Sequence, residues 1–144
     1  MPTLTTNFSL TKPDHGQTGW DALLNANLDT IDTGLASPMG APNVVTSTST
    51  PLFDLSKGHV HILTMTMTAS APIVQNPKDG QVYKFIIKQD GVGNWSFTFP
   101  SSFKGAGVIS TAQGNAAANK INIQVFTWYN ADSAFYPWGP MITI

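Results

Sequence analysis

Hydrophobic side chains recur at helical spacing in one early part of the chain. The pattern predicts a helix near residues 19–33, because Thr18-Gly19-Trp20-Asp21 resembles a capping box and Gly34 followed by Pro38 provides a stop. Its apolar positions fall on one stripe, formed by Trp20, Leu24, Leu28, Ile31 and Leu35. A helix this short is marginal alone in water, so the stripe must be buried against something.

Two partners for this stripe stay open. It packs onto the chain's own β domain, or it associates with the same stripe of other copies around a symmetry axis, since the spacing from Leu24 onward is that of a short heptad seam. The Ser/Thr/Pro-rich stretch 37–51 separates the helix from the rest of the chain, which speaks for self-association. In that case the protein is a homotrimer, and the five stripe residues are its oligomerisation residues.

From about residue 43 the pattern changes to short extended runs separated by turn residues, which is typical of a β-sandwich or barrel. The runs predict strands at 43–47, 59–68, 82–89, 95–99, 120–128 and 141–144, with weaker candidates at 52–55 and 72–75. A Gly-, Ala- and Asn-rich segment, 104–119, predicts a long surface loop.

The centre of the expected core lies around one predicted hairpin. Strand 82–89 alternates apolar and lysine positions, so one of its faces is expected to be wet. Residues 90–94 predict the hairpin loop, and Trp95, Phe97 and Phe99 then alternate toward a common face.

The predicted fold class is therefore mainly β. We expect an antiparallel, jelly-roll-like β-sandwich preceded by an extended N-terminal arm and one short oligomerising helix. The expected divisions are an arm at 1–17, the helix with its possible trimeric seam at 18–36, a linker at 37–51 and the sandwich at 52–144.

Charge narrows the possible partners. The chain has seven Lys, eight Asp, no Arg and no Glu, and its net charge is −1. Scattered lysines do not neutralise phosphates, so we expect no nucleic-acid partner and no membrane-surface role. No apolar run approaches the roughly 20 residues of a membrane span, and the N-terminus lacks signal-peptide features, so assembly in the cytoplasm is expected. The absence of Cys excludes disulfides and thiolate sites.

The sequence contains few residues in arrangements that could support catalysis. Glycosidases need a pair of carboxylates, whereas here Glu is absent and the Asp residues are spread over loops and the helix. Asp79 and Asp90 stand in Asp-Gly turns, where Asp caps its own backbone and Gly takes a positive φ. We expect no enzyme and no cofactor.

The pattern His59-Val60-His61 is the one candidate metal feature. Side chains at i and i+2 of a strand share a face, so three chains around an axis could present six imidazoles to one ion. The alternative is that His59 and His61 are two partly exposed polar residues at the start of a strand.

Aromatic residues gather near the C-terminus and offer a second candidate site. Trp128, Tyr129, Tyr136 and Trp138, with Phe135 among them, could form a platform for a glycan, since such rings combine a flat apolar face with a polar handle. They could equally fill a core or a subunit interface, which is the interpretation that we favour.

Two stretches resemble small structural proteins of tailed-bacteriophage virions. The first stretch runs from Asn7-Phe8-Ser9-Leu10-Thr11-Lys12-Pro13 through Gly19-Trp20 to Asn25-Ala26-Asn27-Leu28-Asp29-Thr30-Ile31-Asp32. The second comprises Gln75-Asn76-Pro77-Lys78-Asp79-Gly80-Gln81-Val82-Tyr83, Gln89-Asp90-Gly91-Val92-Gly93, Phe99-Pro100-Ser101 and Asn119-Lys120. The shared positions are turns, a cap and core aromatics, so the resemblance transfers no catalytic residue.

The resemblance implies a trimeric, β-rich appendage on a virion that is assembled in the host cytoplasm. The first expectation is a head fibre, cement or decoration protein whose partners are its own copies and capsid or other virion proteins. The second is a tail-fibre or receptor-binding subunit that contacts a host surface glycan. A third, a carbohydrate-binding module outside viruses, is disfavoured by the missing signal peptide.

Overall fold

The computed structural model describes residues 3–4, 11–12, 18–19, 22, 24–31 and 41–144. The chain divides into two compact units, Met1–Gly40 and Ala41–Ile144, and each is described by itself. The division lies within the expected linker 37–51, so residues 41–51 belong to the second unit, and a strand already begins at Asn43.

The first unit contains the predicted helix. Residues 22 and 24–31 are helical, and the Thr30 hydroxyl donates a hydrogen bond of 2.8 Å to the carbonyl of Ala26 one turn earlier. Within the predicted arm, strand β1 (Thr3–Leu4) pairs antiparallel with β2 (Thr11–Lys12). The rest of that arm lies outside the described residues.

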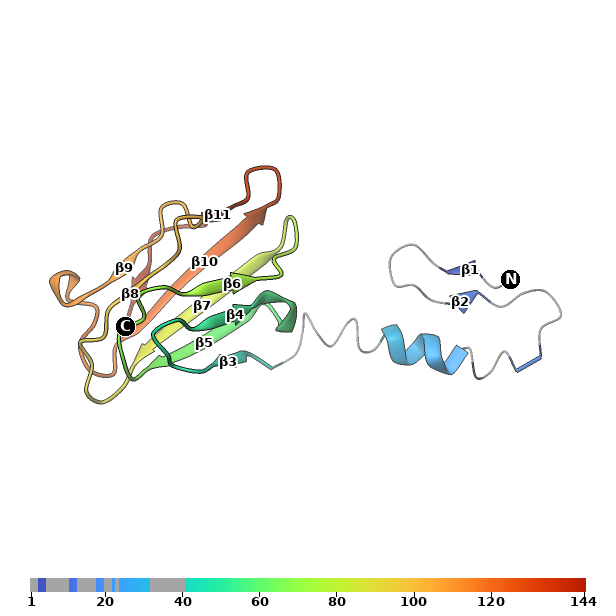
Figure 1. The fold of residues 1–144 in the computed structure, drawn as a ribbon, viewed down its shortest axis with the longest axis horizontal. Coiled ribbons are helices and arrows are strands. Elements are labelled where there is room, and N and C mark those ends of the chain that lie inside the picture. The colour runs from blue at the N-terminus through green and yellow to red at the C-terminus, as the bar shows by residue number, and fades with distance from the viewer. Residues whose placement is uncertain (1–2, 5–10, 13–17, 20–21, 23, 32–40) are drawn as a thin grey trace. The chain divides into compact units, whose positions relative to one another are not determined.

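The second unit is built almost entirely from strands, of which β7 and β10 are the longest (Figure 1). They are β3 (Asn43–Val45), β4 (Leu52–Asp54), β5 (Val60–Met65), β6 (Ile73–Gln75), β7 (Val82–Gln89), β8 (Phe97–Thr98), β9 (Val108–Ile109), β10 (Ile121–Tyr129), β11 (Ala134–Pro137) and β12 (Ile142–Thr143). Single 3-10 turns, η1 (Leu55–Lys57) and η2 (Thr111–Gln113), follow β4 and β9. The prediction of a mainly β chain with one short helix is confirmed.

Six of these strands form one large sheet in the order β11-β10-β7-β5-β3, with β12 pairing along β10. Strands β4 and β6 form one small sheet, and β8 and β9 form another. The expected antiparallel pairing is wrong for β5, which runs parallel to both β3 and β7, and for the β4–β6 pair. Parallel neighbours need a crossover, and the segment between β5 and β7 supplies it by forming β6 in the small sheet.

The core is an aromatic cluster on one face of the large sheet. Phe85 of β7 is fully buried, and its ring meets those of Phe53 on β4, Phe99 and Phe103 at centroid distances of 5.3–5.4 Å, edge to face. Such edge-to-face pairs are favourable beyond the area that they bury. The small sheets therefore cover this inner face of the large sheet (Figure 1).

The predicted hairpin around residues 90–94 is wrong, although its core residues are right. Strand β8 pairs with β9 and not with β7, so the loop carries the chain from the large sheet to a small one. Phe97 and Phe99 are nevertheless buried on the common face, with Trp95 packed against them. Two apolar strand faces satisfy each other by stacking across a core as well as by edge pairing, which the alternation alone does not distinguish.

The segment 104–119 is more than the surface loop that its composition predicts. It contains β9 and η2, and it buries Ile109 and Ala116 completely. The buried Gln124 amide of β10 holds it in place by accepting from the Gly107 N–H at 2.9 Å. Glycine at 107 is needed here, because a Cβ would lie 2.7 Å from the Met141 side chain.

Candidate functional site

The four residues of the predicted aromatic platform lie on opposite faces of the large sheet. Trp128 turns inward and stacks obliquely on Phe135 at 4.6 Å, and its indole N–H donates to the Asn130 side chain at 2.6 Å. Tyr129, Tyr136 and Trp138 lie on the opposite, outer face of the large sheet, as expected when successive residues of a strand face opposite ways. Three of the four residues thus share one surface.

Trp138 is the most exposed of these rings, at 72%. Its indole N–H donates to the Thr127 hydroxyl at 2.7 Å, which fixes the ring on the sheet. A shallow hollow of about 250 Å³ lies beside it, lined by Ile123, Gln124, Val125, Trp138, Gly139, Pro140 and Ile142. An exposed ring next to a hollow offers an apolar surface on which a sugar ring can stack.

Tyr129 and Tyr136 form the other end of this surface. Their rings meet edge to face at 6.0 Å, and the Tyr136 hydroxyl donates to the Asp132 carboxylate at 2.8 Å. That hydrogen bond, with the negative charge of Asp132, raises the pKa of Tyr136. The Tyr136 phenol therefore stays protonated at neutral pH.

The candidate metal pair His59 and His61 is divided by burial. The structure differs from the expectation of two partly exposed residues, because the His61 ring is fully buried while His59 is partly exposed. His61 stacks on Phe85 at 5.6 Å, and its Nε2–H donates to the Gly58 carbonyl at 2.9 Å. Its Nδ1 accepts from the Asn43 amide at 3.1 Å, so both ring nitrogens are engaged.

Burial lowers the pKa of His61 and keeps the ring neutral. Metal binding by the His59/His61 pair stays a prediction, and it would require His61 to give up one of its two hydrogen bonds. Elsewhere in the described part of the chain, no three His, Cys, Asp or Glu residues cluster as metal ligands would.

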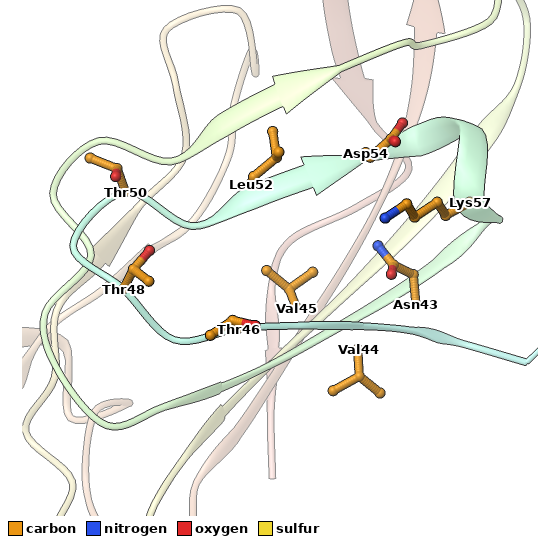
Figure 2. A pocket seen from close by; sticks show the side chains of 9 residues that line it. All are labelled: Asn43, Val44, Val45, Thr46, Thr48, Thr50, Leu52, Asp54 and Lys57. Atoms are coloured by element: carbon orange, nitrogen blue, oxygen red, sulfur yellow. The ribbon is translucent and has the colours of Figure 1, made fainter.

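A groove that the sequence did not reveal lies between β3 and β4 (Figure 2). It has a volume of about 440 Å³ and is lined by Asn43, Val44, Val45, Thr46, Thr48, Thr50, Leu52, Asp54 and Lys57. In the loop between the strands, threonines that line the groove alternate with serines that face away from it. The Ser47 hydroxyl accepts from the residue 66 N–H, and the Ser49 carbonyl accepts from the N–H groups of residues 70 and 71. The sequence signal that could have indicated this groove is the threonine at every second position of residues 46–50.

One end of the groove carries both of its charges. Oδ1 of Asp54 accepts from the Asn76 amide at 2.9 Å and from the Ser56 hydroxyl at 2.7 Å. The hydrogen bond from Asn76, followed by those from Ser56, lowers the pKa of Asp54 and keeps it ionised. Figure 2 shows Lys57 extending into the groove toward the same end. The rest of the lining combines three threonines with the apolar side chains of Val44, Val45 and Leu52.

Of the five predicted oligomerisation residues, three lie within the described part of the chain. Leu24 and Leu28 are 46% and 53% exposed, and Ile31 is partly exposed. Trp20 and Leu35 lie outside the described residues. The described helical residues include no segment long and apolar enough to cross a membrane.

Comparison with known proteins adds no relative. No protein-family model, no curated protein and no solved structure matches this chain.

Proposed function

We propose that this protein is a non-enzymatic structural component of a bacteriophage particle, a trimeric head-fibre or decoration protein on the capsid surface. Its partners are then two further copies of itself and capsid or other virion proteins. The sequence resemblance to small tailed-phage virion proteins supports the context. The single structural observation that supports self-assembly is the exposure of Leu24 and Leu28 on the helix.

The helix supports the trimer on physical grounds. Leu24 and Leu28 are already about half buried, so each gains roughly half of the 1.5–3 kcal/mol of a fully exposed leucine, about 0.8–1.5 kcal/mol, when it is fully buried, which favours association of several copies. The same association costs about 4–15 kcal/mol in lost freedom for each partner docked. The helix then guides assembly, and contacts elsewhere contribute to holding it.

In this proposal the second unit is the outward-facing β-sandwich, and the N-terminal arm and helix grip the capsid or a neighbour. The two layers of the sandwich are the large sheet and the small sheets that cover its inner face. The parallel pairing of β5 departs from the all-antiparallel strand order of a jelly roll, so we retain the two layers and not that order.

Cryo-electron microscopy of purified particles tests the location. Copies distributed over the capsid are the expected result. Copies found only at the tail tip would overturn the capsid assignment and support the tail-fibre alternative. Absence of the protein from particles of the phage that encodes it would overturn both.

Light scattering of Leu28→Asp tests the seam. The wild-type chain is expected at three times its 15.4 kDa, and the variant at the monomer mass with an unchanged β-sheet circular dichroism spectrum. Asn25→Asp is the matched control, because it adds the same charge at an exposed helical position off the stripe and should stay trimeric. A variant that unfolds throughout would instead place the helix in the core of its own chain.

A receptor-binding tail subunit remains the second candidate, and the exposed ring of Trp138 beside its hollow favours it. On this alternative, binding to host-surface glycan is lost in Trp138→Ala. Val92→Ala, at a similarly exposed position in the β7–β8 loop, leaves glycan binding unchanged. Equal binding by the wild-type chain and Trp138→Ala would remove this candidate.

A further inference from the structure

The outer face of the large sheet is unusually apolar for a surface. Along β7 the buried residues are Tyr83, Phe85, Ile87 and Gln89, so the residues between them point outward, and the same alternation holds in β5 and β10. The outward positions are Val44, Val60, Ile62, Thr64, Val82, Lys84, Ile86, Lys88, Ile121, Ile123, Val125, Thr127, Tyr129, Tyr136 and Ile142. Contiguous apolar patches of this kind mark sites of interaction with other molecules.

The strand register aligns five of these residues into one continuous line. Ile142 pairs with Ile123, Ile123 with Ile86, Ile86 with Ile62, and Ile62 with Val44. This aliphatic row crosses the sheet from β12 to β3 at right angles to the strands. Its two ends are the most open, since Ile142 is 61% and Val44 is 75% exposed.

Two lysines stand on either side of the row at its centre. Lys84 and Lys88 flank Ile86 on β7, two residues before it and two after it. Among the outward positions of the large-sheet strands they are the charged residues, and no carboxylate accompanies them there. The face is thus apolar along a line and cationic on both sides of that line.

These dimensions match a helix. Four strand intervals of about 4.8 Å give the row a length of roughly 19 Å, which is the length of about 13 helical residues at 1.5 Å each. The Cα atoms of the two lysines, four residues apart on a strand, are separated by about 14 Å. A helix with side chains is roughly 10–12 Å wide, so it fits between the lysines with both its flanks within their reach.

We propose that the outer face of the large sheet docks an acidic amphipathic helix of a partner protein. The apolar stripe of that helix lies along the aliphatic row, and carboxylates on its two flanks pair with Lys84 and Lys88. Packing against the same face of a second copy is the poorer solution, because it would bring four lysines together between strands that carry no carboxylate at an outward position, and the Asp132 carboxylate of the β10–β11 turn already accepts from the Tyr136 hydroxyl.

Binding of a synthetic helix to the full chain tests the proposal. The probe is a dye-labelled peptide of about 14 residues with one leucine stripe and Glu on both flanks, and the comparison peptide carries Lys in place of each Glu. Fluorescence anisotropy is expected to show at least about tenfold tighter binding of the acidic peptide, the effect of two ion pairs replaced by two repulsions.

Charge reversal on the protein identifies the face. The variant Lys84→Glu/Lys88→Glu is expected to exchange the preference and bind the basic peptide about tenfold more tightly than the acidic one. Lys78→Glu/Lys104→Glu is the matched control, because it makes the same change in net charge at exposed positions off this face and should keep the wild-type preference. Ile86→Thr, which keeps a β-branched side chain at the centre of the row, should weaken both peptides severalfold.

Three results would overturn the proposal. Equal binding of the two peptides to the wild-type chain would reduce the surface to general hydrophobic adhesion. A loss of preference in the Lys78→Glu/Lys104→Glu control would show that net charge, and not this face, selects the peptide. Self-association in analytical ultracentrifugation that Ile86→Thr abolishes and Leu28→Asp does not would make a second copy the occupant.

Discussion

Among substitutions that add only one methyl group, Gly93→Ala should be one of those that lower the stability of the fold most. Gly93 lies in the loop between β7 and β8, where its φ is +69°. A Cβ at this position would lie 2.7 Å from Cα of Ala118 and closer still to the Ala118 amide nitrogen. Those atoms are backbone, and hydrogen bonds fix the two segments together, since the Asn119 N–H donates to the Asp90 carbonyl at 2.9 Å. Neither side can move aside cheaply.

Three glycines separate the two contributions to this cost. At Gly114 φ is +68° and nothing lies within 4 Å of an added Cβ, so alanine there costs only the conformational strain, about 1 kcal/mol. At Gly93 overpacking adds roughly 1–3 kcal/mol, for a total of about 2–4 kcal/mol. Gly91 has neither a positive φ nor a close neighbour, so alanine there should be neutral or slightly stabilising.

Urea unfolding of the full chain, followed by tryptophan fluorescence, measures the series. The expected order of stability is Gly91→Ala, then Gly114→Ala, then Gly93→Ala, with m-values unchanged. In thermal melts the Gly93 variant should lose roughly 8–16 °C. If Gly93→Ala costs no more than Gly114→Ala, the contact between this loop and residues 117–118 does not form as described, and the reasoning fails.

Two further predictions concern the core. Burial lowers the pKa of His61, so the unfolded chain takes up a proton before the folded chain does as the pH falls below about 6.5. The free energy of unfolding should therefore decrease below that pH, by up to about 1.4 kcal/mol per pH unit. His61→Gln should flatten this slope in urea titrations between pH 6.5 and 5. An equal slope in the variant would assign the effect to other groups. Phe85→Ala should cost about 3–5 kcal/mol by opening a cavity among its ring neighbours, whereas Val92→Ala, at a 68% exposed site, should change the free energy of unfolding by less than about 0.5 kcal/mol. Similar urea midpoints for these two variants would contradict the described core.

Local pattern was sufficient for the long strands. The predicted strand 82–89 has the observed bounds, and the predicted 120–128 differs from β10 by one residue at each end. The short strands β9 and β11 were missed because each is only two to four residues long and is defined by its pairing, β9 with β8 and β11 with β10. Parallel pairing of β5 with β7 likewise follows from the crossover through β6, which no local alternation encodes.

The candidate sites show the same limit. Trp128 and Tyr129 face opposite ways, as strand alternation requires, but alternation alone did not say which of the two rings lies in the core. Burial of His61 could not be read locally, because its ring nitrogens are satisfied by the Gly58 carbonyl and by Asn43, a residue of a neighbouring strand 18 positions away. A polar residue enters a core when the fold supplies its partners, and those partners are fixed by topology.

In strand β10 the usual placement of apolar residues inside and polar residues outside is inverted. Asn122 and Gln124 point into the protein, while Ile121, Ile123 and Val125 point out. The amides are not misplaced: Asn122 donates to the Asn115 carbonyl at 3.0 Å and accepts from the Thr143 hydroxyl at 2.7 Å, and Gln124 holds the backbone at residues 105, 107 and 139.

Shifting β10 by one residue would bury its three aliphatic side chains, but it would expose the fully buried Phe126 and leave those backbone groups without partners. The inward amides therefore fix the register, and the register is what places Ile123 in line with Ile86 and Ile62 on the outer face. The hydrogen bonds of these buried amides thus keep the aliphatic side chains of β10 on the outer face. This face is the surface on which we expect a partner to dock.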